Sequence, residues 1–129
     1  MAFSKIGLIG KYGDPSVADT LLRLNELLKK RHCEVWLEAN TAKHMPGHSL
    51  ATADFDEIGQ KCDLAITVGG DGTLLHSARS LVDQDIALLG VNLGRLGFLV
   101  DVSPDQIEKQ LNEVLSGEHV EEHRIILTA

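Results

Sequence analysis

Short apolar runs that alternate with helix-forming segments constrain the fold of this chain most. Each run is almost continuously apolar at its centre, whereas a strand with one solvated face alternates apolar and polar residues. Such strands are typical of a parallel sheet that helices cover on both faces. We therefore expect an α/β domain, Rossmann-like and three-layered, with a mainly parallel sheet. The expected strands are Lys5–Gly10, Glu34–Glu38, Leu64–Val68, Ile86–Val91 and Arg124–Thr128.

The segments between these runs carry helix signals. The first expected helix begins at Pro15, with Asp14 as its N-cap, and ends in basic residues that offset the helix dipole. Further helices are expected over Asp54–Lys61, over Leu74–Val82 and from Ser103 to Gly117. The apolar face of the first helix recurs at helical spacing, at Val17, Leu21, Leu24 and Leu28.

The segment Asn40–Ala53 has no clear period, and we expect it to form a mobile surface loop. It contains His44 and His48, which stand at a spacing that suits a metal site on a helix. Pro46 and Gly47 lie between them and disfavour a helix, so no residue is assigned as a metal ligand.

Composition excludes several classes of function. The chain has 129 residues, enough for one domain, and a formal net charge of -7, which argues against the basic face of a nucleic-acid-binding protein. No apolar run approaches the roughly 20 residues of a membrane span. No signal peptide is recognisable, and the isolated cysteines, Cys33 and Cys62, suit reduced thiols with a packing role. We therefore expect a cytoplasmic protein that binds no membrane.

The pentapeptide Gly69-Gly70-Asp71-Gly72-Thr73 directly follows the apolar run Leu64–Val68 and carries the clearest chemistry. Glycines allow a large anion to approach the backbone, and a helix start offers free N–H groups to phosphate. Asp71 is then a general base or a magnesium partner, and Thr73 caps the next helix or adds a hydroxyl. The structural alternative is a sharp Asp-Gly turn that joins a strand to a helix. The pattern is neither a Walker A loop nor a dinucleotide-binding fingerprint.

A second glycine-bearing loop, Asn92–Leu99, follows the next strand. Both loops come after strand ends, so we expect them on the rim where parallel sheets bind ligands. Asn92 has two open interpretations. It contacts the ligand or holds the two loops in register, or it is an asparagine that tolerates a left-handed turn.

Together the two loops resemble those of one family. Gly69–Thr73 is similar to the phosphate loop shared by NAD kinases, diacylglycerol and sphingosine kinases, and 6-phosphofructokinases. Asn92–Leu99 is similar to the Asn-x-Gly-x-Leu-Gly-Phe-Leu signature of NAD kinases, and the final Glu122-x-Arg124-x-x-Leu127 resembles the approach to their second domain. Over most of its length the chain thus resembles the NAD kinase family.

The resemblance implies specific roles and partners. Asp71 matches the catalytic acid, which accepts the proton of the 2′-hydroxyl of NAD's adenosine ribose as that oxygen attacks ATP. Gly69 and Gly70 match the cradle for the ATP phosphates, Gly72 a backbone contact to the dinucleotide, and His76 a weaker basic contact to the nucleotide. Thr73 and Asn92 complete the expected nucleotide-binding set. The implied partners are NAD, ATP or polyphosphate, and Mg²⁺.

The resemblance also implies a missing partner domain. NAD kinases resemble two-domain proteins in which a β-rich domain supplies much of the NAD pocket, so residues 1–129 are expected to be the N-terminal domain. Alone this domain is expected to be inactive, and apolar surface around its end favours a homo-oligomer. The alternatives are a lipid kinase of the diacylglycerol type and a nucleotide-binding module without catalysis.

Overall fold

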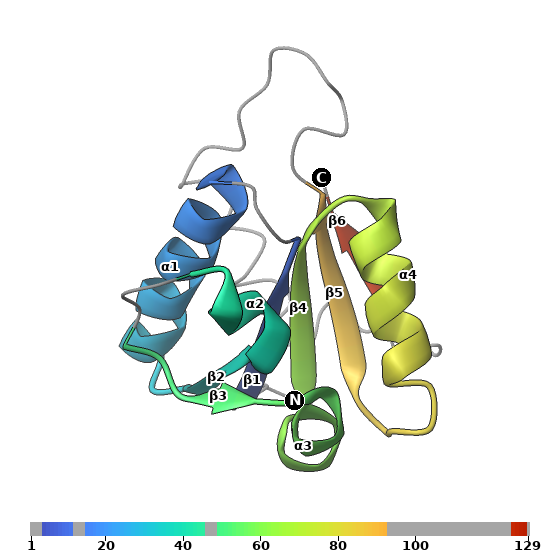
Figure 1. Ribbon diagram of the computed structural model, residues 1–129. Helices are drawn as coiled ribbons and strands as arrows, with labels where there is room; N and C mark the ends of the chain where they lie inside the picture. Colours follow the sequence, from blue (N-terminus) through green and yellow to red (C-terminus); the bar gives the residue numbers. More distant parts are fainter. Residues whose placement is uncertain (1–3, 12–14, 46–48, 93–124, 129) are drawn as a thin grey trace.

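The computed structural model describes residues 4–11, 15–45, 49–92 and 125–128 (Figure 1). For Pro15, Asp71, Asn92 and residues 125–128 it describes the backbone alone. Strands and helices alternate along the chain. The strands are β1 (Lys5–Gly10), β2 (Glu34–Glu38), β3 (Thr52–Ala53), β4 (Leu64–Gly69), β5 (Ala87–Asn92) and β6 (Ile125–Thr128). The helices are α1 (Pro15–Lys30), α2 (Ala39–Lys43), α3 (Phe55–Lys61) and α4 (Asp71–Ser80).

The described strands form one sheet in the order β3-β2-β1-β4-β5-β6, and every neighbouring pair is parallel. This confirms the expected α/β class. The strand order reverses direction between β1 and β4, which are direct neighbours in the sheet. In open parallel sheets such a switch point leaves a crevice at the carboxyl ends of the two strands, where ligands bind.

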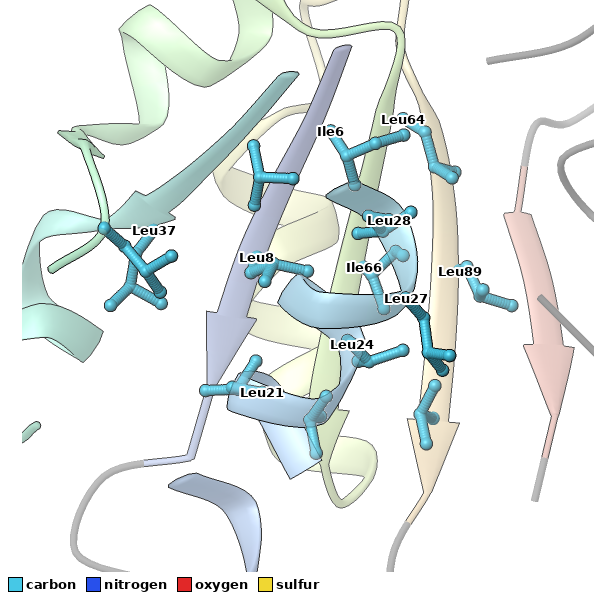
Figure 2. Packing of buried hydrophobic residues seen from close by; sticks show 14 of the residues in the cluster. Ile6, Leu8, Leu21, Leu24, Leu27, Leu28, Leu37, Leu64, Ile66 and Leu89 are labelled. Carbon is cyan, nitrogen blue, oxygen red and sulfur yellow. The ribbon is translucent and has the colours of Figure 1, made fainter. Parts of the chain in front are cut away.

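Helices cover both faces of the sheet, as the continuous apolar strands predict. Figure 1 shows α1 and α4 on opposite sides of the strands. Alternate residues of one strand divide between the faces: Ile6 and Leu8 of β1 belong to the core cluster under α1, and Ile9 belongs to the cluster on the other face. In Figure 2, Leu21, Leu24, Leu27 and Leu28 of α1 lie over the strands. Val17, the remaining residue of the predicted face, belongs to the same core cluster. Within the described residues both faces of the sheet therefore carry buried apolar side chains, so a ligand would approach at the ends of the strands.

The expectation of a mobile loop over Asn40–Ala53 is wrong. The structure forms α2 and the short strand β3 there, and Thr41, Met45 and Leu50 are buried. Tertiary contacts stabilise elements too short to show a period: β3 pairs with β2 through Leu37 and Thr52, and the Glu38 side chain caps α2. Short segments of this kind depend on packing rather than on intrinsic propensity.

The other expected elements that fall within the described residues are confirmed, with changed ends. The helix expected over Leu74–Val82 begins at Asp71 and ends at Ser80, and α3 begins after an Asp54 N-cap. The expected Asp14 cap, the loop beyond Asn92 and the helix from Ser103 lie outside the described residues. Within the residues described, no helix is long and apolar enough to cross a membrane.

Candidate functional site

The site begins where β1 and β4 end side by side. Gly10 of β1 is in register with Val68 of β4, and the Lys11 amide donates a hydrogen bond of 2.9 Å to the Val68 carbonyl. The chain leaves β1 at Lys11, and β4 continues one residue further to Gly69. The glycine loop that the sequence singles out therefore lies at the switch point of the sheet.

Gly69 is required by the protein's own geometry. Its φ of 153° lies in a region that side-chain-bearing residues rarely adopt. A Cβ built there would lie 2.9 Å from both Lys11 Cβ and Thr73 Oγ1. The absence of a side chain thus allows β1, β4 and the first turn of α4 to meet closely.

Gly70 and Gly72, in contrast to Gly69, have no close neighbours among the described residues at the position of a side chain. A Cβ at either position would have no described atom within 4 Å. Packing within the described protein therefore does not explain the choice of glycine at these two positions. They leave open space next to the backbone, which is what a bound phosphate needs in order to reach the N–H groups.

The N-terminus of α4 is not capped by a side chain. Gly70 is the N-cap residue and makes no side-chain cap hydrogen bond, and the Leu74 amide donates to the Gly70 carbonyl at 3.3 Å. The amides of Asp71, Gly72 and Thr73 precede this first helical bond, so they have no partner within the helix. Free amides and the positive end of the helix dipole together favour an anion.

Thr73 and Asp71 both lie in the first turn of α4. Because Gly70 occupies the N-cap, the expectation that Thr73 caps the helix is wrong. The Thr73 carbonyl instead accepts a hydrogen bond of 2.8 Å from the Ser77 hydroxyl. Thr73 is half-buried, and its own hydroxyl has no hydrogen-bond partner among the described residues, so it is available to a ligand. Asp71 is the first residue of the helix, immediately after the open loop.

Asn92 and His76 have contrasting positions. Asn92 ends β5 and is in register with Gly69, so the two predicted loops leave the sheet from neighbouring strands. His76 is exposed one turn beyond Asp71, and its ring meets the Phe55 ring edge-on, with 5.6 Å between centroids. The remaining residues of the second loop lie outside the described part of the chain.

A buried polar network beside the rim was not anticipated from the sequence. The Glu38 carboxylate accepts hydrogen bonds from the backbone amides of Asn40 and Thr41 and from the Thr41 hydroxyl. The Thr41 hydroxyl oxygen in turn accepts from the Gly10 amide at 3.1 Å. Glutamate is not among the preferred N-cap residues, so the sequence holds only a weak signal of this arrangement.

The cysteines lie apart from the site. Cys62 precedes β4, at the opposite end of that strand, and burial raises the pKa of its thiol to about 12. Burial also raises the pKa of Cys33. Both thiols remain protonated at neutral pH, in agreement with the expected packing role. The described part of the chain holds no group of three His, Cys, Asp or Glu residues that could bind a metal by itself.

Comparison with known proteins gives concordant results. Residues 6–119 match the family model described as "ATP-NAD kinase N-terminal domain". The chain is 46% identical over 127 residues to the NAD kinases of Pseudomonas entomophila and Pseudomonas putida, and the match covers 98% of this chain. It covers 43% of each relative, so the chain spans less than half of their length.

A solved structure shares the fold. Yeast NADH kinase complexed with NADH superposes with a TM-score of 0.70 over 92% of this chain and 40% of the yeast chain, at 24% sequence identity. The switch-point glycine loop, the family model and the Pseudomonas relatives agree: the chain belongs to the NAD kinase family.

Proposed function

We propose that this chain is the N-terminal domain of an NAD kinase that phosphorylates the 2′-hydroxyl of the adenosine ribose of NAD, giving NADP. The observation that carries the proposal is the open space at Gly70 and Gly72, next to the uncapped N-terminus of α4. The family description and the names of the relatives support the same reaction.

In the proposed reaction, Gly69 and Gly70 face the phosphates of ATP, and Gly72 and Asn92 face the dinucleotide. The free amides at the start of α4 and the Thr73 hydroxyl donate to phosphate oxygens, which offsets their charge. His76 remains a weaker candidate for a nucleotide contact, because its ring already packs against Phe55.

Asp71 acts as the general base of the transfer. Its carboxylate accepts the proton of the 2′-hydroxyl while that oxygen forms a bond to the terminal phosphorus of ATP. The bond from that phosphorus to the bridging oxygen breaks, and ADP leaves with the bond's electron pair. Phosphoryl transfer depends mainly on positioning and charge stabilisation, so a rigid helix start is a suitable place for the base.

Magnesium fits this arrangement only as a partner of the nucleotide. Mg²⁺ is commonly held by one or two carboxylates together with substrate phosphates. The loop Gly69–Thr73 contains a single carboxylate, that of Asp71, which would be its one protein ligand there. When bound, the ion would neutralise phosphate charge.

The remaining parts of the proposal concern the whole protein. We propose that a β-rich second domain completes the NAD pocket, that the enzyme is a cytoplasmic homo-oligomer, and that ATP or polyphosphate is the donor. The chain spans 43% of the length of its Pseudomonas relatives, which leaves room for such a domain.

The test is an assay of the full-length protein for NADP formation from NAD, with ATP and with polyphosphate as donors. We expect NADP with at least one donor and severe loss of activity in Asp71→Asn. A protein that phosphorylates diacylglycerol instead would reveal a lipid kinase. ATP binding without any product would reveal a non-catalytic module.

A further inference from the structure

The end of β1 is held by a side chain at the point where its neighbour β2 stops. β2 ends at Glu38 and the chain turns into α2, so β2 offers no further backbone carbonyl to β1. The Thr41 hydroxyl takes that place and accepts the Gly10 amide at 3.1 Å. On the other side of the same strand end, the Lys11 amide donates to the Val68 carbonyl. Gly10 and Lys11 are therefore fixed from both sides.

The direction of the Thr41 hydroxyl proton follows from the distances. The oxygen lies 2.8 Å from a Glu38 carboxylate oxygen and 3.4 Å from the Gly10 carbonyl. One hydroxyl carries one proton, and the short contact to a carboxylate is the stronger hydrogen bond. Thr41 thus donates to Glu38 and keeps a lone pair for the Gly10 amide.

This network is shielded from water. Glu38 is 1% exposed and Thr41 is 2% exposed. The carboxylate also accepts the Asn40 amide at 2.7 Å and the Thr41 amide at 3.0 Å, so it is fully engaged. Hydrogen bonds in a dry environment define geometry closely, because no water can replace a displaced partner.

The network lies next to the glycine loop through Lys11. Lys11 follows Gly10, and its Cβ lies 2.9 Å from the position that a Cβ of Gly69 would occupy. Any shift of the end of β1 therefore displaces Lys11 against Gly69 or moves it away from the loop. The next residues of that loop are the ones to which the proposed function assigns the ATP phosphates and the catalytic base.

We propose that Thr41 and Glu38 are positioning residues for phosphoryl transfer, which hold the end of β1 and thereby the ATP-facing side of the Gly69–Thr73 loop. This inference rests on the proposed function. Neither residue touches substrate. A displacement of about 1 Å at reacting groups is enough to cost on the order of 100-fold in rate, so indirect support of this kind has measurable effects.

The experiment compares Thr41→Val with Thr41→Ser in the full-length protein. Valine has a similar shape but cannot accept the Gly10 amide, whereas serine retains the hydroxyl. We expect Thr41→Val to raise the KM for ATP about tenfold with less than a twofold change in the KM for NAD, and Thr41→Ser to remain within about twofold for both. Equal KM values for ATP in folded Thr41→Val and Thr41→Ser would overturn the proposal.

Two matched variants separate positioning from general stability. Thr20→Val makes the same change at a helix threonine whose hydroxyl donates, among the described residues, to the Ser16 carbonyl, and it should leave both KM values unchanged. If Thr41→Val does not fold, Glu38→Gln carries the test against Asp54→Asn, which alters the cap of α3. A severalfold rise in the KM for ATP in Glu38→Gln alone supports the proposal, and equal values in both variants overturn it.

Equilibrium binding of ATP distinguishes failure of this inference from failure of the proposed function. Calorimetric titration of the same proteins should show about tenfold weaker ATP binding in Thr41→Val. If the unsubstituted protein binds ATP but forms no NADP, the kinase proposal fails, and weaker binding in Thr41→Val still supports the positioning role. Unchanged binding in that variant contradicts it.

Discussion

Two turns at the same edge of the sheet, β2–α2 and β4–α4, both lead from a parallel strand into a helix. At the first, the Glu38 carboxylate occupies the helix N-terminus and accepts two backbone amides. At the second, Gly70 provides no side-chain cap. The α3 N-terminus resembles the first, because Asp54 and Glu57 form a capping box there. Of these three helix N-termini, that of α4 is the one without a side-chain cap, so its backbone amides can bind an external anion.

The two kinds of turn also differ in how closely other atoms of the protein surround them. The α2 cap is buried, with Glu38 and Thr41 almost inaccessible. The α4 turn has open space at Gly70 and Gly72. A helix end that completes its own hydrogen bonds contributes to stability, whereas an end left open gives up that contribution for binding. The following predictions test this division, from the largest expected effect to the smallest.

The largest effect is expected for Asp71→Asn in the full-length protein. An amide cannot accept the 2′-hydroxyl proton as a carboxylate does, so kcat for NADP formation should fall about 10²- to 10⁴-fold. The affinity for ATP, measured by titration without magnesium, should change little, because the amides of the turn remain. Full activity in Asp71→Asn would remove the base assignment.

A large loss of stability is expected for Gly69→Ala. The φ of 153° and the contacts with Lys11 and Thr73 make a side chain unfavourable there, at a cost of about 1–3 kcal/mol in unfolding free energy. Urea denaturation of the variant and of the unsubstituted protein measures this cost. An unchanged midpoint would show that the close approach of β1 and β4 does not need glycine.

Gly72→Ala should stabilise the protein and weaken nucleotide binding at the same time. No described atom lies near the added methyl group, and alanine is the better helix former, so unfolding free energy should rise by about 0.4–1 kcal/mol. The methyl group occupies space assigned to the ligand, so nucleotide affinity should fall about tenfold, or 1.4 kcal/mol. A variant that gains stability and binds normally would refute the assigned role of that open space.

The smallest effect is expected for Asp54→Ala at the capped α3 turn. Loss of the cap should lower the unfolding free energy by about 1 kcal/mol. The KM values for ATP and NAD should not change, since this turn completes its own hydrogen bonds. A rise in either KM would contradict the distinction between the two kinds of turn.

The sequence predicts the long elements well because each carries its own signal. The face Val17, Leu21, Leu24 and Leu28 has helical period, and all four residues are buried in α1. The run Leu64–Val68 is almost continuously apolar because both faces of β4 are covered. In these segments local pattern and tertiary packing agree.

The region after β2 could not be predicted for a physical reason. α2 has five residues and β3 has two, which is too short for a period to appear. Their stability comes from Glu38, Thr41 and pairing with β2, contacts that form only in the folded chain. The lack of a clear period in this segment therefore suggested a loop.

The sequence predicted which residues form the glycine loop, but not why each position is a glycine. The motif identifies Gly69, Gly70 and Gly72 together, whereas the structure gives them different reasons to be glycine. Gly69 is required by the φ angle and by contacts within the protein, while Gly70 and Gly72 border open space. Only coordinates distinguish a glycine that the fold needs from a glycine that leaves room for a ligand.

The most direct test of the central claim is an amide NMR titration of the full-length protein with ATP. We predict that the backbone amides of Gly70, Gly72 and Thr73 shift on binding, while those of Asn40 and Glu57 at the capped turns do not. Shifts centred on the α2 or α3 N-terminus, with the α4 turn unchanged, would contradict the claim that the uncapped turn receives the phosphates.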